Sequence, residues 1–538
     1  MSKMPSVYRV TEAEAPALVR PDRPDPEAAP FASDQNGAAH LATDRVAPEM
    51  SDANEEQQPS SLESLPVEIR IRILENMPDL KTLGSLIHAS PVYFAQYRFN
   101  RKSLLCRCLQ QDLGREVLVE AYAAFNSRSS KIGPRTVPNR NVTDFVDLYG
   151  AWRYSSDPAI MLKSMSLSDV RWLTWFHTLT VKPLATQLST WASTNLESAA
   201  AKATEEQRMQ AKSASSKETP TCNTWPGGFS VTEQRRILRA FYRFEIFCHL
   251  FSGEQHQSFR HDDIARIFLS QFESWEIEEM GCVYTWIKQR YGEIVAEIKW
   301  DLHPNNPKFA TDPNFGFEPE GAFTLDRDDD EYMNGTIGRG GLRLALHMFK
   351  TKDHDKLVDL MGKYLKRSQE YFFGDCMQDV SQADRRGDDN GFNDRDRAEQ
   401  RGEPMPFTGD GNVSTFCSDN ISLDITTTSG STPHPANTKE SAREVAAVVS
   451  SISAPPLAWV LMWDGKYCNL YGDYVPDDFR RWGYILWDER RWNSIEGALG
   501  LLIRLWASSS QLKMAREDWA WLGGRQPLLV NDPVTTLG

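Results

Sequence analysis

The sequence predicts a mainly α-helical protein with a three-helix motif near its N-terminus, a central multi-helix domain, and a small Trp-rich α+β unit near its C-terminus, with long disordered segments between them. Three observations predict this fold class. Apolar residues recur at helical spacing through most of 62–373. Eight of the 16 Trp fall between residues 455 and 525. The intervening segments are polar and poor in large apolar side chains, a composition typical of disorder.

These patterns divide the chain into eight segments. We expect disorder in 1–60, a three-helix motif in 62–106, a helical region in 107–196 and a flexible linker in 197–226. We then expect a helical region in 227–375, a disordered linker in 376–450, the Trp-rich unit in 455–525 and a tail in 526–538. Within the second helical region, 301–336 is rich in Pro, Asn and Asp, so we expect a long connection there.

The composition narrows the possible classes of function. A net charge of −14 argues against binding to nucleic-acid backbones, which needs clustered Lys and Arg. The eight Cys show no disulfide-framework spacing, so we expect reduced thiols in a cytoplasmic and/or nuclear protein. No secretory signal begins the chain, and Pro455-Pro456 interrupts the uncharged run from Val445 to Trp463. We therefore expect neither a nucleic-acid partner nor a membrane span.

The first helix of the N-terminal motif has clear boundary signals. Pro66 suits a first helical turn, where its missing N–H costs nothing. Ile69, Ile73 and Met77 lie four residues apart and so share one helix face. Pro78 ends this helix. The pattern predicts a short amphipathic helix with one apolar face.

Two more helices follow with the same punctuation. Asp79 can cap the second helix, and Pro91 forces a break before the third. The second helix carries Leu80, Leu83, Leu86 and Ile87, and the third carries Tyr93, Phe94, Tyr97, Leu104 and Leu105. Three short amphipathic helices cannot close a large core, so the motif needs either the following helices or a partner surface.

The run Leu65-Pro66-x-Glu68-Ile69-x-x-x-Ile73-Leu74 resembles the start of an F-box, and 78–93 is similar to F-box-like proteins common in filamentous fungi. Tyr93 stands where many F-boxes carry Trp. The runs 268–279 and 480–488 resemble further parts of this large, mostly uncharacterised family. The resemblance implies an adaptor that docks on a Skp-type subunit of a cullin–RING ubiquitin ligase and recruits an unknown protein substrate. The expected contacts to the Skp-type partner are Leu65, Pro66, Ile69, Ile73, Leu74, Leu83 and Leu86.

Two other functions remain open. The motif could be the structural start of a non-catalytic helical scaffold, in which case 65–90 would be buried against 104–125 and later helices. More remotely, the chain could be an enzyme of unrecognised type, which would need a pocket with converging titratable groups. No nucleophile elbow, His-Glu-x-x-His or protease Cys signature is present in the sequence. The sequence thus predicts a protein-interaction role and no catalytic residue.

Several acidic, glycine-rich and Cys/His runs contain residue types that bind ligands, but each lacks a feature that such a site requires. The tract 326–331 lacks the Gly and the Glu that an EF-hand loop needs at fixed positions. The glycines of 335–341 follow no strand and precede no Gly-Lys-Ser/Thr. Cys106, Cys108, Cys248 and His249 lack the chelating pairs of a zinc site and fit helix packing better. We therefore expect no metal and no cofactor.

The C-terminal unit combines a predicted hairpin with short helices. The apolar runs 459–463 and 467–471 flank Asp464-Gly465, a pair that suits the positive φ values of a two-residue hairpin turn. Pro476 suits a helix start and Gly483 a helix stop. The Trp side chains could form a core or line an exposed groove, and we favour a core.

Overall fold

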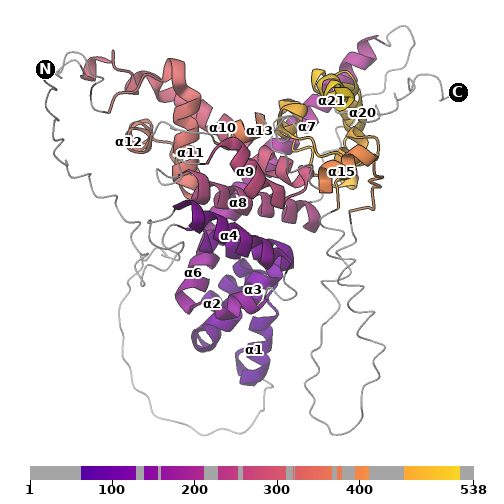
Figure 1. Cartoon of the computed structure of the whole chain (residues 1–538). Helices are drawn as coiled ribbons and strands as arrows, with labels where there is room; N and C mark the ends of the chain where they lie inside the picture. The colour runs from indigo at the N-terminus through magenta and orange to yellow at the C-terminus, as the bar shows by residue number, and fades with distance from the viewer. Residues whose placement is uncertain are drawn as a thin grey trace, which may run out of the picture. The chain divides into compact units, whose positions relative to one another are not determined.

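The computed structural model describes residues 62–128, 138–154, 159–210, 228–252, 259–309, 319, 321–365, 372–378, 394–410 and 454–521. Within these ranges every regular element is a helix, which agrees with the predicted mainly helical class (Figure 1). The segments 1–60 and 526–538, assigned above to disorder and to a tail, lie outside the described residues, as do 211–227 and 411–453.

The N-terminal motif forms the predicted three helices. After a 3₁₀ turn, η1 (Leu62–Ser64), come α1 (Val67–Glu75), α2 (Leu80–Ala89) and α3 (Pro91–Asn126). As predicted, Asp79 caps α2 by accepting a hydrogen bond from the backbone N–H of Thr82 at 2.6 Å. Ser90 caps α3 in the same way for Tyr93. Both α1 and α2 pack on α3, which extends well beyond the motif and is kinked at Asn100 and at Gly114, where φ is +65°.

The region after the motif is helical, as predicted, and extends further than expected. It comprises α4 (Pro138–Arg153), α5 (Ala159–Ser164), α6 (Leu167–Phe176), a π-helical turn η2 (His177–Val181) and α7 (Lys182–Gln210). Helix α7 therefore runs into the segment 197–226 that the sequence pattern assigned to a linker. Ala200 and Ala203 are buried there. The buried face of this part of α7 is thus formed by small Ala side chains, which a search for large apolar residues does not detect.

Helix α8 lies at the centre of the fold, in contact with α3, α7, α10 and α11. The elements of this region are α8 (Val231–Phe251), α9 (His261–Ile267), η3 (Leu269–Gln271), α10 (Ser274–Leu302), η4 (Pro307–Phe309), α11 (Leu325–Lys350), α12 (His354–Tyr364) and α13 (Phe373–Gln378). The expected connection 301–336 is too long, because α11 already begins at Leu325. The acidic tract and the glycines of 335–341 are thus part of a helix. Gly341 alone among those glycines has a positive φ, +55°, and the next N–H, of Leu342, donates to the Glu245 carboxylate.

The C-terminal unit contains α17 (Leu457–Met462), η6 (Gly472–Tyr474), α18 (Asp477–Arg481), α19 (Glu489–Ser494), α20 (Ala498–Ala507) and α21 (Ser510–Trp521). The predicted hairpin is wrong, because 457–462 is helical. The positive φ at Asp464 and Gly465 is confirmed. However, the chain after this turn pairs with 403–405, where the N–H of Met405 donates to Gly465 and that of Tyr467 to Glu403. No strand longer than this isolated bridge occurs among the described residues.

Part of the segment assigned to a disordered linker is therefore structured. Helix α15 (Asp394–Arg401) and the chain to Asp410 pack against the C-terminal unit and α10, and Ala398 and Met405 are buried. Trp459, Trp463, Trp482 and Trp487 belong to the core, as we favoured. All four side chains are at most 7 % exposed. The ring of Trp463 contacts the rings of both Trp459 and Trp506.

Candidate partner-binding face and buried ion-pair network

The structure divides the seven residues expected to contact a Skp-type partner into two groups. Leu74 and Leu83 are 0 % and 2 % exposed and belong to the core that α1 and α2 make with α3. Pro66 and Ile69 are exposed, and Leu65, Ile73 and Leu86 are half-buried. The buried pair holds the motif together, whereas the other five leave apolar surface open to solvent.

Further apolar side chains of the N-terminal motif are exposed, and sequence reasoning missed them. Leu62 is 61 % exposed, Val67 39 % and Phe94 44 %. A signal for Val67 was available, because it lies next to Pro66 and off the stripe formed by Ile69 and Ile73. We define the docking face as seven exposed or half-buried apolar residues from η1 to α2: Leu62, Leu65, Pro66, Val67, Ile69, Ile73 and Leu86.

Polar contacts fix the start of the docking face on α3. The Glu63 carboxylate accepts a hydrogen bond from the Ser90 hydroxyl. The Tyr93 hydroxyl donates to the carbonyl of Leu62 at 3.3 Å, and Arg70 donates to the carbonyl of Glu63 at 3.1 Å. The turn before α1 is therefore tied both to α1 and to the first turn of α3. This anchoring lowers the entropy that a partner would have to offset by ordering the segment.

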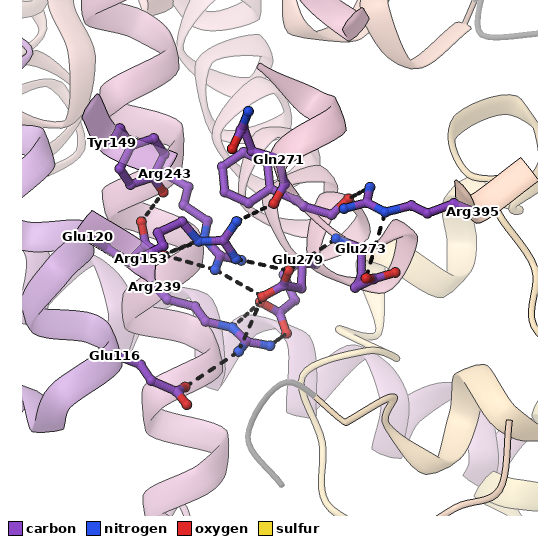
Figure 2. A network of polar contacts seen from close by, with 12 residues as sticks. Glu116, Glu120, Tyr149, Arg153, Arg239, Arg243, Gln271, Glu273, Glu279 and Arg395 are labelled. Carbon is purple, nitrogen blue, oxygen red and sulfur yellow. Dashed lines mark hydrogen bonds and ion pairs between the residues drawn. The ribbon is translucent and has the colours of Figure 1, made fainter. Parts of the chain in front are cut away.

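The second prominent cluster is a network of buried charges between α3, α4, α8 and α10 (Figure 2). Arg239 binds Glu279 through two nitrogens, at 2.7 and 2.5 Å. Arg243 reaches Glu120 on α3 and Glu276 on α10, each at 2.9 Å. Arg153 of α4 also pairs with Glu276, at 3.3 Å. These contacts join four helices through charges that are almost fully removed from water.

The pKa shifts in this network follow from burial and from the arginines. Burial raises the pKa of Glu116 to about 7, although Arg239 and Arg243 act in the opposite direction. Burial also acts to raise the pKa of Glu276, but the adjacent arginines outweigh it and hold this pKa well below its usual value. The arginines nearest to Glu276 are Arg153, Arg239 and Arg243. Glu276 is thus a permanent anion at neutral pH that the surrounding guanidinium groups neutralise.

A second set of buried ion pairs ties the C-terminal unit to α8 and α10. Glu278 on α10 accepts two hydrogen bonds from Arg480, at 2.9 and 3.0 Å. Glu233 on α8 binds Arg491 at 2.8 and 2.7 Å. Arg236 binds two carboxylates at 2.8 Å each, Asp488 from the C-terminal unit and Asp410 from the chain after α15. Each pair joins positions far apart in sequence, so these charges fix the tertiary arrangement.

One array resembles a catalytic triad but is not positioned for catalysis. The Ser127 hydroxyl lies 2.8 Å from Nδ1 of His249, whose Nε2 lies 3.3 Å from Glu245. However, Ser127 is 0 % exposed and its hydroxyl also lies 3.1 Å from the carbonyl oxygen of Ala124. A serine nucleophile must reach its substrate from an open site. The array instead links the end of α3 to α8 and, through Glu245, to α11.

The cysteines weighed as ligands are buried structural residues. Cys106, Cys108 and Cys248 are each at most 8 % exposed. Burial raises the pKa of the Cys108 thiol to about 12 and that of Cys248 well above its usual value. Both shifts disfavour the thiolate, which is the form that binds metals and attacks electrophiles. Among the described residues no group of His, Cys, Asp and Glu has the arrangement of a metal site.

Comparisons with protein-family models, with curated proteins and with solved structures returned no match. In the part of the chain that the structure describes, none of the helices combines the length and the apolar character that crossing a membrane requires. We therefore infer function from the chain's own residues, of which the docking face and the groups around it carry the most specific chemistry.

Proposed function

We propose that the chain is an F-box-type adaptor. In this proposal the docking face binds a Skp-type subunit of a cullin–RING ubiquitin ligase, and the remainder of the chain recruits a protein substrate. The observation that carries the proposal is the division of the motif: Leu74 and Leu83 pack inward while Pro66 and Ile69 stay exposed. A motif that served only to complete the core would turn its apolar side chains inward.

The size of the exposed face is sufficient for specific binding. Burying a fully exposed Leu or Ile stabilises a complex by roughly 1.5–3 kcal/mol, so partly exposed side chains contribute on the order of 1 kcal/mol each. The docking face has seven apolar residues, of which a few would dominate the affinity. Three of them together would therefore account for about 3 kcal/mol, or roughly a hundredfold in affinity.

The test is titration calorimetry of the full chain with a purified Skp-type subunit. We expect the variant Leu65→Ala/Pro66→Ala/Ile69→Ala to bind at least a hundredfold more weakly than the wild type. The matched control is Leu148→Ala/Ile160→Ala/Ile503→Ala, because these side chains are 54 %, 61 % and 44 % exposed on other helices. The control should bind as the wild type does. No binding by the wild type, or equal binding by both triple variants, would contradict the proposal.

A second candidate function is a non-catalytic helical scaffold with an F-box-like start. The observation that favours it is that α3, although kinked at Asn100 and Gly114, packs on both α1 and α2 of the motif and on α8. This candidate function predicts a stably folded chain that does not bind the Skp-type subunit. The same calorimetric titration separates the two candidates, because only the adaptor gives a binding isotherm that depends on Leu65, Pro66 and Ile69.

A further inference from the structure

A cleft lies between α10 and the C-terminal unit, and no residue of the docking face lines it. Its volume is about 630 Å³. One wall is a face of α10 that extends from Gly281 to Ala296. The opposite wall comes from η6 and α18, and Met333 and Met377 add apolar surface. The cleft is therefore bounded by the same two elements that the Glu278–Arg480 pair holds together.

The dimensions of the cleft favour an elongated ligand. Gly281 and Ala296 are fifteen helical steps apart, which corresponds to about 22 Å along α10. An extended chain covers that length with roughly six or seven residues. The residues that line the cleft along α10 therefore span the length of a short extended peptide.

The groups along the cleft suit a peptide better than an anion or a cation. Its rim carries both signs of charge. Lys288 and Arg481 are positive, and Glu293 and Asp473 are negative. The neutral side chain of Gln289 donates to Glu293 at 3.3 Å, and its carbonyl oxygen is an acceptor of the kind that pairs with a peptide N–H. A rim of mixed charge gives no preference for a polyanion such as nucleic acid.

Gly292 is the feature that the fold itself does not require. It lies inside α10, where glycine costs roughly 1 kcal/mol relative to Ala. At Gly281 an added Cβ would lie 3.0 Å from Met377, so packing explains that glycine. At Gly292 an added Cβ would meet nothing within 4 Å, and the open space above it is the cleft. A missing side chain at this point lets a ligand approach the helix backbone closely.

We infer that this cleft binds an extended peptide segment of a partner protein, of about six or seven residues, along the α10 face from Gly281 to Ala296. The identification of that partner as the recruited substrate rests on the proposed adaptor function, whereas peptide binding itself does not. The peptide places an apolar side chain against Met333 and Met377 and its backbone near Gly292. Its charged side chains pair with the mixed rim.

The test begins by panning a phage-displayed library of random twelve-residue peptides on the full chain, followed by fluorescence-anisotropy titration of the enriched peptides. The variant Gly292→Trp places an indole in the cleft and removes a helix-destabilising glycine, so it should fold. The matched control is Gly500→Trp, in the first turn of α20, where an added Cβ would also meet nothing within 4 Å. We expect Gly292→Trp to weaken peptide binding at least tenfold and Gly500→Trp to change it less than twofold.

Three outcomes would overturn the inference. They are the absence of any enriched peptide, equal binding to both glycine variants, and binding that appears only after deletion of 379–393. The last result would assign the cleft to a segment of this chain that follows α13. Binding to the Skp-type subunit is measured on the same samples and should be unchanged in Gly292→Trp. Failure of the peptide site and failure of the docking face are thus distinguishable.

Discussion

The ion pair between Glu278 and Arg480 offers the sharpest test of how this fold is held together. The Glu278 side chain is 0 % exposed and the Arg480 side chain 7 %. The carboxylate accepts from two nitrogens of Arg480, from the N–H of Gly472 at 2.7 Å and from the hydroxyl of Tyr484 at 3.2 Å. Replacing Arg480 with Met removes the only one of these donors that carries a charge.

The expected magnitude follows from what Arg480→Met leaves behind. A buried carboxylate without its cation is destabilising by about 3–5 kcal/mol, a large part of the 5–15 kcal/mol that stabilises a typical domain. Glu278→Gln/Arg480→Met removes both charges and should be less destabilised than Arg480→Met alone. Two neutral groups of similar volume can replace a buried ion pair at little net cost. The double variant therefore distinguishes loss of the attraction from exposure of an unpaired charge.

Urea unfolding followed by Trp fluorescence measures this effect, because Trp459, Trp482 and Trp487 report on the unit that Arg480 anchors. The matched control is Arg401→Met, which breaks a surface pair with Glu403 whose side chains are 57 % and 46 % exposed. An exposed pair of this kind contributes about 0–1 kcal/mol. If Arg480→Met costs no more than Arg401→Met, or if the double variant is the least stable, the reasoning is refuted.

Two further predictions concern pH and the division of the motif. Burial raises the pKa of Asp488 to about 6, so this group favours the folded state below about pH 4, and that contribution is lost as the pH rises through 6. As the pH rises from 4 to 7, the free energy of unfolding of Asp488→Asn minus that of the wild type should therefore increase by up to about 3 kcal/mol. A difference that stays constant over this range would contradict the assignment. For the motif, Leu83→Ala should destabilise the chain by about 2–5 kcal/mol and Ile69→Ala by less than about 1 kcal/mol, because only Leu83 is buried; equal shifts in the urea midpoint would show that the exposed and inward groups are wrongly assigned.

The helices of the N-terminal motif could be predicted because their signals are local. Pro78 and Pro91 end two helices by steric and hydrogen-bonding effects that need no tertiary context. Asp79 caps α2 as its residue type and position predict. The four-residue spacing of Ile69 and Ile73 places them on one face whatever lies opposite. These features depend on the chain itself, so the sequence was sufficient to predict them.

The predicted hairpin is wrong because the strand preference of 459–463 is only a weak indication of a strand. The run 459–463 contains aromatic and branched residues that favour strands in general, but such preferences depend strongly on packing. In the fold, Trp459 and Trp463 lie four residues apart on one face of α17 and its end, with rings in contact, which a strand would not allow. The turn at Asp464 and Gly465 was predicted correctly because positive φ is a local property.

The spacing of charged residues in α8 and α10 indicates the buried ion-pair network, although the sequence analysis did not predict it. Arg239 and Arg243 are four residues apart in an otherwise largely apolar part of α8, so a charged stripe there had to be either exposed or paired. The complementary charges lie at the start of α10, where Glu276 and Glu279 are three apart. Which glutamate meets which arginine could not be derived, because the pairing depends on how the helices cross.

Arg243 connects the two sites that the proposals assign to different partners. Its guanidinium binds Glu120 on α3 and Glu276 on α10 at once, and it lies over the ring of Phe272. Helix α3 carries the docking face on its packed partners α1 and α2, while α10 forms one wall of the cleft. A buried charge that is shared in this way cannot move away from either helix without exposing an unpaired carboxylate. Under the adaptor proposal, Arg243 would therefore hold the part of α3 that follows its kink at Gly114 at a fixed separation from the α10 wall of the cleft.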